Sequence, residues 1–115
     1  MADKNRNIEI LKGTVTIATS DTTTAGTNTY SLINGQASHV TFTTPNMTAT
    51  NSTKLEVIIT ESPVGTVFDS GTKAESSSFS IGSSFPLYGP INIVATSQGT
   101  ESADKAIPFT IYYET

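Results

Sequence analysis

The chain has 115 residues and a formal net charge of −4, with 14% charged residues and no cysteine. Its length suits a single domain. Without thiols it has no disulfide framework, thiolate metal site or cysteine nucleophile. The six lysines and arginines are scattered, so we expect no nucleic-acid partner, and no apolar run is long enough for a membrane span. Solubility rests instead on 21 threonines and 14 serines.

The polar start, MADKNRN, is followed by no apolar stretch of the kind that a secretory signal requires. We therefore expect a polar arm over residues 1–7, one domain over residues 8–115 and synthesis in a cytoplasm. No window has the apolar spacing of an amphipathic helix. Alternation with a period of two recurs instead, and threonine, valine, isoleucine and the aromatic residues favour strands.

The first predicted strand region covers residues 8–19. Its apolar positions before and after Gly13 fall in opposite alternation phases, which predicts a bulge or a change of sheet at the glycine. A polar loop is expected over residues 20–28, because this stretch is made almost entirely of threonine, serine, glycine, asparagine and aspartate.

Asn34-Gly35 is the clearest turn signal in the chain, because this dipeptide favours the type I′ turn of a two-residue hairpin. Such a turn would place Tyr30 opposite His39, with Thr41 on the same solvated face as the histidine. The apolar residues that alternate with them would point into the core.

Further strands are predicted from short alternating segments bounded by turn residues. These are KLEVIIT (54–60), TVFD (66–69), SFSI (78–81), INIVATS (91–97) and AIPFTIYYE (106–114). Pro108 marks an edge or a strand entry, because proline cannot donate a ladder hydrogen bond. Seven or eight short strands with turns every 8–12 residues predict a single antiparallel β-sandwich.

Several of these segments resemble the strands of an immunoglobulin-like or fibronectin-III-like domain. HVTFTT, KLEVIIT, GTVFDSG, SSFSI, GPINIVATSQG and AIPFTIYYE resemble strands B, C, C′, E, F and G, over roughly residues 36–114. The chain has no tryptophan and no cysteine pair, which separates it from antibody-type domains. The resemblance therefore implies an immunoglobulin-like sandwich without that signature.

In style, the short polar start, the threonine-rich strands and the lack of cysteine are similar to the immunoglobulin-like accessory proteins of tailed-phage virions. This resemblance implies a capsid decoration or cement protein in the virion, bound to the major capsid protein or another virion protein. It also implies a homo-oligomer, for which a trimer suits symmetric lattice points. A tail or head-fibre component and an adhesin-like module that binds glycans or proteins are the alternatives.

No catalytic, cofactor or metal site is predicted. A catalytic or ligating histidine needs an orienting partner and further ligands, and His39 is the only histidine. Zinc needs three or four such ligands. Glu101 and Asp104 share a loop tip, but a calcium loop needs more oxygen ligands at alternating spacing. We therefore interpret His39 as a cross-strand partner and the two carboxylates as solvated.

The segment Asp69-Ser70-Gly71 resembles the catalytic triplet of homodimeric aspartic proteases, in which two such aspartates share a proton. That resemblance would make Asp69 catalytic, although the flap and the late helix of the family are missing. Ser70 and Lys73 also have the spacing of acyl-transfer enzymes, which requires a helix. The glycine and the serine-rich sequel disfavour a helix, so the triplet is also explained as a turn.

The expected partner-binding residues are Ile8, Ile10, Leu11 and Tyr112. The three apolar residues near the start could add a strand to a neighbour's open edge. Tyr112 falls in the outward phase of the last strand, and exposed aromatic residues commonly anchor interfaces.

Overall fold

The computed structural model describes residues 8–20, 22, 29–30, 34–47, 54–62, 64–88, 90–97 and 99–115. The predicted arm over residues 1–7 and most of the loop over residues 20–28 lie outside this part. The described residues form nine strands and no helix that could cross a membrane. The strands are β1 (Ile8–Ile17), β2 (Thr29–Tyr30), β3 (Gly35–Thr43), β4 (Lys54–Glu61), β5 (Gly65–Asp69), β6 (Lys73–Ala74), β7 (Ser78–Leu87), β8 (Ile91–Ser97) and β9 (Lys105–Glu114).

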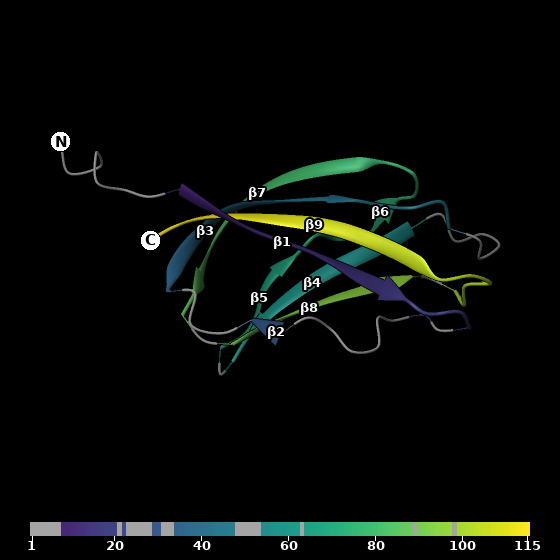
Figure 1. Ribbon diagram of the computed structural model, residues 1–115, viewed down its shortest axis with the longest axis horizontal. Coiled ribbons are helices and arrows are strands. Elements are labelled where there is room, and N and C mark those ends of the chain that lie inside the picture. The colour runs from purple at the N-terminus through teal and green to yellow at the C-terminus, as the bar shows by residue number, and fades with distance from the viewer. Residues whose placement is uncertain are drawn as a thin grey trace.

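The strands build two antiparallel sheets that pack face to face (Figure 1). One sheet has the order β1-β9-β3-β7, and the other has the order β2-β8-β4-β5, with β6 paired to the end of β4. Four of the pairings are nested: β1 with β9, β2 with β8, β3 with β7 and β4 with β5. They correspond to the arms of one long hairpin that is rolled up, which is the topology of a jelly roll.

The prediction of an all-β, antiparallel sandwich is confirmed, whereas the immunoglobulin-like connectivity is not. In an immunoglobulin domain the last strand joins strands C and F in one sheet. Here β9 lies between β1 and β3, in the sheet opposite β4 and β8. The two architectures share the same alternation of apolar and polar residues, so the strand patterns alone do not distinguish them.

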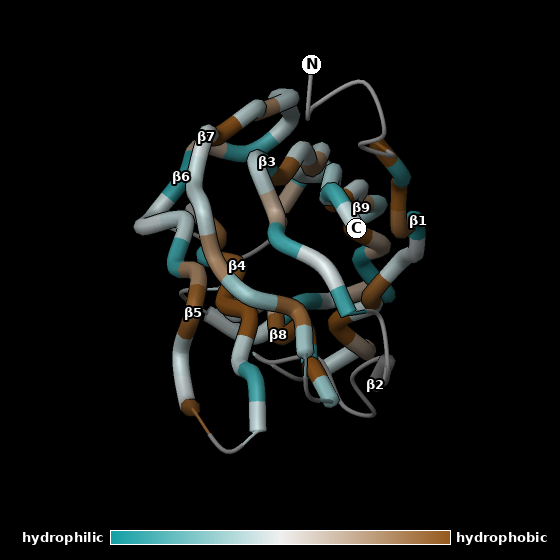
Figure 2. The backbone as a smooth tube through the Cα atoms, turned by 90° about the vertical axis from the view of Figure 1, so that its left-hand side faces the viewer, coloured by the Kyte–Doolittle hydropathy of each residue, from teal (hydrophilic) through white to brown (hydrophobic). Residues whose placement is uncertain are grey.

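The core lies between the two sheets and follows the alternation of the strands. In β4 and β9 the alternating apolar residues point inward, as predicted, and every second residue of β8 is buried as well. Figure 2 shows hydrophobic stretches on β4 and β8 in the interior. The buried apolar residues are Val15, Ile17, Ala37, Val40, Phe42, Met47, Leu55, Val57, Ile59, Phe68, Phe85, Leu87, Ile91, Ile93, Ala95, Ile107, Phe109 and Ile111.

β1 contains no bulge, contrary to the expectation at Gly13. Its ten residues pair with β9 in unbroken register from Ile8 opposite Glu114 to Ile17 opposite Lys105. The two phases therefore belong to two faces of one strand. Ile8 and Ile10 point outward, and the apolar residues after the glycine point into the core.

The predicted hairpin between Tyr30 and His39 is wrong. β2, which contains Tyr30, pairs with β8 in the other sheet. β3 has β7 on one side and β9 on the other, so no position remains beside it, and His39 lies opposite Gly82 and Tyr112. Asn34 has a positive φ of 56°, but Gly35 does not, so the two residues do not form the predicted type I′ turn, which requires a positive φ at both. Residues 31–33 lie outside the described part of the chain.

β7 is longer than the four predicted residues and extends to Leu87. Pairing with β3 holds the segment extended although it contains Gly82 and Pro86, so tertiary contacts override the weak strand propensity.

Pro108 lies within β9, a central strand. The ladder between β3 and β9 ends at the pair of Phe42 and Phe109, so Pro108, which has no N–H, is paired with β1 but not with β3.

Because Gly35 has no side chain, Tyr113 and the backbone of Glu114 can approach it closely at the end of this sheet. A Cβ atom at this position would lie 2.7 Å from Cδ2 of Tyr113 and 2.8 Å from the backbone oxygen of Glu114. Substitution Gly35→Ala should therefore displace the tyrosine ring or β9 and lower the free energy of unfolding by about 1–3 kcal/mol. Urea denaturation at equilibrium measures the change.

The matched control is Gly82→Ala. Gly82 lies in β7 of the same sheet, and a Cβ atom there would meet nothing within 4 Å. This variant should be as stable as the parent or slightly more stable. Equal destabilisation by the two substitutions would contradict the steric explanation.

Candidate interaction face

The outward side chains of β1, β9, β3 and β7 form a broad surface that we call the outer face. Cross-strand register arranges them in rows, because residues directly opposite each other point to the same side. Across β1 and β9 the rows are Ile8–Glu114, Ile10–Tyr112, Lys12–Thr110, Thr14–Pro108 and Thr16–Ala106. Among the described outward residues of these four strands, the permanent charges are on Lys12 and Glu114, so the outer face is dominated by hydroxyl, aliphatic and aromatic groups.

The central feature of the outer face is a row of Ile10, Tyr112 and His39, which we call the aromatic row. The rings of His39 and Tyr112 stack, with their centroids 4.1 Å apart and their planes inclined by 10°. Ile10 lies opposite Tyr112 on the other side and is 50% exposed. A flat stack beside an exposed isoleucine is a typical anchor for a protein partner, because aromatic side chains bury much area at a low entropy cost.

A register shift in β3 sets the position of His39. The shift lies between Ala37 and His39 in the ladders with both β7 and β9. Ser38, at the shift, donates a 3.3 Å hydrogen bond from Oγ to the backbone oxygen of Tyr112, and its Oγ also lies 3.3 Å from Nδ1 of the histidine. The interpretation of His39 as a cross-strand partner is therefore correct, but its partner is Tyr112.

The four expected partner-binding residues do not share one face. Ile8, 73% exposed, Ile10 and Tyr112 lie on the outer face near the start of β1 and the end of β9. Leu11 points the other way and packs partly buried against the core. The structure thus brings together three of the four residues and adds His39 to them.

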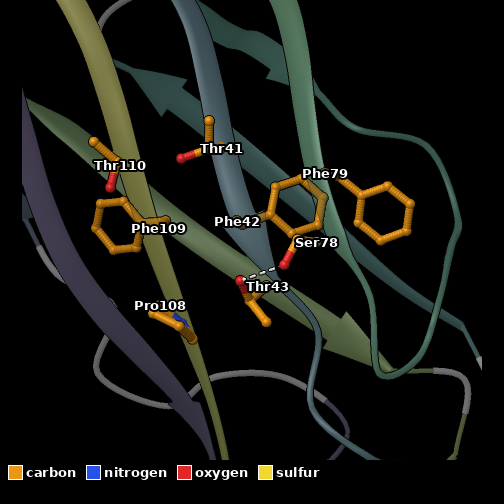
Figure 3. A pocket seen from close by; sticks show the side chains of 8 residues that line it. All are labelled: Thr41, Phe42, Thr43, Ser78, Phe79, Pro108, Phe109 and Thr110. Atoms are coloured by element: carbon orange, nitrogen blue, oxygen red, sulfur yellow. Dashed lines mark hydrogen bonds between the residues drawn. The ribbon is translucent and has the colours of Figure 1, made fainter.

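A hollow of about 280 Å³ opens on the outer face where β3 and β9 separate after Phe42 and Phe109 (Figure 3). Thr43 and Ser78 share a hydrogen bond of 3.1 Å at its rim. Its lining consists of Thr41, Phe42, Thr43, Ser78, Phe79, Pro108, Phe109 and Thr110. None of these side chains titrates near neutral pH, so the hollow suits noncovalent contact and not acid–base or metal chemistry.

The Asp69-Ser70-Gly71 triplet forms a turn at the end of β5. Oδ1 of Asp69 accepts a 2.9 Å hydrogen bond from the backbone N–H of Gly71, whose φ is +70°. Ser70 is buried, and its Oγ accepts from the backbone N–H of Val57 at 2.8 Å and donates to the backbone oxygen of Gly71 at 2.7 Å. These hydrogen bonds explain why aspartate, serine and glycine occur here: they stabilise the turn and the end of the strand.

The Ser70 and Lys73 pair is not brought together for chemistry. Lys73 begins the short strand β6, and its Nζ lies 5.7 Å from the centroid of the Phe79 ring, within cation–π range. The oxygen of Ser70 is already bonded to backbone groups. The helix that the acyl-transfer spacing requires is not formed over residues 70–73.

Asp69 also interacts with Glu56 of β4 on the outside of the second sheet. A hydrogen bond between the two carboxyl groups raises the pKa of Glu56, and desolvation and the negative charge of Asp69 act in the same direction. The same hydrogen bond, together with the one from the N–H of Gly71, lowers the pKa of Asp69. The pKa values of the two carboxyl groups are therefore shifted in opposite directions by one interaction.

The loop between β8 and β9 is tied to the end of β1. Asp104 accepts hydrogen bonds of 2.9 Å from the backbone N–H and from Oγ1 of Thr19, which lower the pKa of its carboxyl group. The backbone oxygen of Glu101 accepts from the N–H of Ser20 at 2.7 Å, and the Glu101 side chain is buried. Asp104 is solvated as expected, whereas Glu101 is buried, contrary to the expectation.

No cluster of three or more histidine, cysteine, aspartate or glutamate side chains able to hold a metal ion occurs in the described ranges.

Two buried polar side chains form hydrogen bonds to distant backbone groups that the sequence did not predict. Oγ1 of Thr44 donates to the backbone oxygen of Ala74 at 2.7 Å and accepts from the N–H of Ser77 at 3.0 Å. Oε2 of Glu61 accepts from the N–H of Tyr88 at 2.6 Å. Thr44 directly precedes Pro45 and Glu61 lies two residues before Pro63, but no residue pattern identifies their distant partners.

No protein-family model matches this sequence, and no curated protein matches it. The chain does superpose on a chain of the cyanophage Pam1 capsid asymmetric unit, with a TM-score of 0.59 and 15% identity over 95% of this chain and 85% of that chain. The similarity to Yersinia pseudotuberculosis-derived mitogen has a TM-score of 0.39 and 10% identity, over 91% and 84% of the two chains. The similarity to the particle of Macrobrachium rosenbergii extra small virus has a TM-score of 0.36 and 8% identity, over 93% and 79%. The first of these similarities establishes a shared fold.

The carboxyl pair gives a testable prediction. Carboxyl-detected NMR should show Glu56 titrating above, and Asp69 below, an ordinary carboxyl group. The contribution of Asp69 to stability is present above its unfolded-state pKa and is lost as pH falls through its lower folded-state pKa. The contribution of Glu56 has the opposite sign: it is present below its unfolded-state pKa and is lost as pH rises through its raised folded-state pKa.

The variant Asp69→Asn should lower the pKa of Glu56, because it removes the carboxylate that accepts a hydrogen bond from protonated Glu56 and, with it, the neighbouring negative charge. As a control, Asp104→Asn removes a carboxylate elsewhere on the surface and should leave Glu56 unchanged. A Glu56 titration that is unaffected by Asp69→Asn would show that the two groups are not coupled.

Proposed function

We propose that this chain is a non-enzymatic structural protein of a virion, most specifically a phage capsid decoration protein that binds an assembled lattice. The observation that carries the proposal is the fold shared with a chain of the cyanophage Pam1 capsid asymmetric unit over nearly the full length of both chains. Jelly rolls host many functions, so the proposal also needs a surface that suits such a role.

The outer face supplies that surface. Its isoleucines at positions 8 and 10 are exposed by 73% and 50%, and the His39–Tyr112 stack lies directly beside the second of them. Rows rich in threonine and serine surround this group and carry little charge. An apolar and aromatic centre within a polar rim that has few charges matches the usual anatomy of a protein–protein interface.

The mechanism would be mass action. A protein that binds the assembled shell, and binds loose subunits weakly or not at all, lowers the free energy of the shell in proportion to its occupancy. The rigid sandwich favours this role, because a preformed face loses little conformational entropy on binding. No bond is made or broken, which agrees with the turn and strand-end roles of Asp69 and Ser70.

The same surface would also suit a tail or head-fibre component, and the distinction rests on where the protein binds. The proposed partner is the major capsid protein, and the proposed location is the virion after synthesis in the host cytoplasm. Capsids of the encoding virus, prepared without this chain, provide the direct test.

We expect saturable co-sedimentation of the chain with such capsids, and electron microscopy should show regular decoration. The variant Tyr112→Ala should weaken binding roughly thirtyfold, equivalent to about 2 kcal/mol for an interface anchor. The matched control is Tyr88→Ala, since Tyr88 is 59% exposed but lies beyond the end of β7, away from the aromatic row. Binding that fails to saturate, or that depends on Tyr88 and not on Tyr112, would contradict the proposal.

A further inference from the structure

The sheet that carries the outer face has two edges, and they differ. β7 forms one edge and contains Pro86, which has no N–H to offer to a further strand. β1 forms the other edge, contains no proline and keeps one unbroken register over all ten of its residues. Figure 2 shows β1 at the margin of the molecule beside β9. A long regular edge with two exposed isoleucines is suited to pair with another strand, which proteins otherwise prevent with prolines and bulges.

We propose that two copies of this chain pair through residues 8–12 of β1, antiparallel and across a two-fold axis, with Ile10 opposite Ile10 of the second copy. A closed two-fold interface must be self-complementary. In an antiparallel pair of identical strands, one residue faces its own copy and its neighbours match symmetrically. Centring on Glu9 or on Lys12 would place like charges directly opposite each other, which is unfavourable.

Centring the pair on Ile10 has three consequences that favour it. Ile10 packs against its own copy on the outer face, which covers the exposed centre of β1. Ile8 lies opposite Lys12 of the second copy, so the lysine stem covers the second exposed isoleucine. Glu9 lies opposite Leu11, which avoids a carboxylate pair. Centring on Leu11 instead would place Ile10 opposite Lys12 and Ile8 opposite Thr14, so neither exposed isoleucine would pack against an apolar residue of the second copy.

Charge complementarity supports the same register. Glu114 lies opposite Ile8 within one copy, and Lys12 of the second copy would lie on the other side of that isoleucine. Two strand spacings separate the lysine and the glutamate backbones, about 10 Å, and both side chains can reach across the isoleucine. The symmetry repeats this arrangement, so Lys12 of each copy lies near Glu114 of the other. Such pairs add little affinity but define register.

The product is a continuous eight-stranded sheet with one aromatic row across the axis. This row would read His39, Tyr112, Ile10, and then Ile10, Tyr112 and His39 of the second copy. The inference replaces the trimer expected from the resemblance with a two-fold pair. It does not depend on the decoration role, although a doubled outer face would strengthen attachment to a lattice with two adjacent sites.

Sedimentation of the free protein tests the stoichiometry. We expect a reversible equilibrium between monomer and dimer. Lys12→Glu should weaken self-association at least about tenfold, because each glutamate at position 12 would approach Glu114 of the other copy. The double variant Lys12→Glu/Glu114→Lys should restore it. A protein that is monomeric or trimeric, or a double variant that is no better than the single one, would overturn the proposal.

Disulfide trapping tests the register, since the chain has no cysteine. Ile10→Cys should oxidise rapidly to a covalent dimer, because opposite residues of antiparallel strands have their Cα atoms within disulfide range. Thr16→Cys, exposed on the same strand, is the control. In the proposed register its two copies lie roughly 40 Å apart, so it should not crosslink. Equal crosslinking at both positions would refute the pairing. A dimer that fails to bind capsids would refute the decoration role alone, and a monomer that binds them would refute the pairing alone.

Discussion

The position of β9 between β1 and β3 is the constraint on which the rest of the structure depends. One face of β9 supplies Ile107, Phe109 and Ile111 to the core, and its other face forms the middle of the rows that contain Thr110, Tyr112 and Glu114. Because its ladders run to β1 on one side and to β3 on the other, residues far apart in the sequence become neighbours. The stack of His39 on Tyr112 and the contact of Tyr112 with Ile10 both result from this arrangement.

The same strand explains the weak points of the outer face. After Phe109 the ladder to β3 stops, and Pro108 continues the pairing with β1 alone. The separation of β3 from β9 opens the hollow, and at the opposite end Gly35 lets Tyr113 and β9 approach closely. The outer face is therefore tightly supported near the end of β9 and open near its start.

Local patterns predicted the all-β sandwich and the inward positions of β4 and β9, because the alternation of a half-buried strand depends only on which sheet face is covered. They failed where the partner strand decides the outcome. His39 was assigned to Tyr30 from a turn signal, but β7 and β9 occupy both sides of β3. Gly82 and Pro86 concealed most of β7, although pairing with β3 holds it extended.

For the candidate interaction face, the alternation phase predicted Tyr112, and the apolar start of the first strand predicted Ile8 and Ile10 as residues that could pair with a neighbour. No pattern in the sequence showed that these residues share a row with His39. It placed Leu11 with them because the residue is adjacent in the chain, whereas the strand turns it to the core. Register over long distances determines which exposed side chains become neighbours, and register cannot be read from propensity. The proposed lattice contact and the proposed two-fold pair both rest on that long-range register.

The nesting of the strands also bears on how the molecule reaches its native state. Ile8 pairs with Glu114, so the first sheet closes only when opposite ends of the described chain meet. Contacts between residues so distant in the sequence slow folding, because the entropy cost of closing the loop is incurred before stabilising contacts form. Until β9 docks, β3 lacks the partner on one of its sides, and this strand is the segment through which immature chains would aggregate.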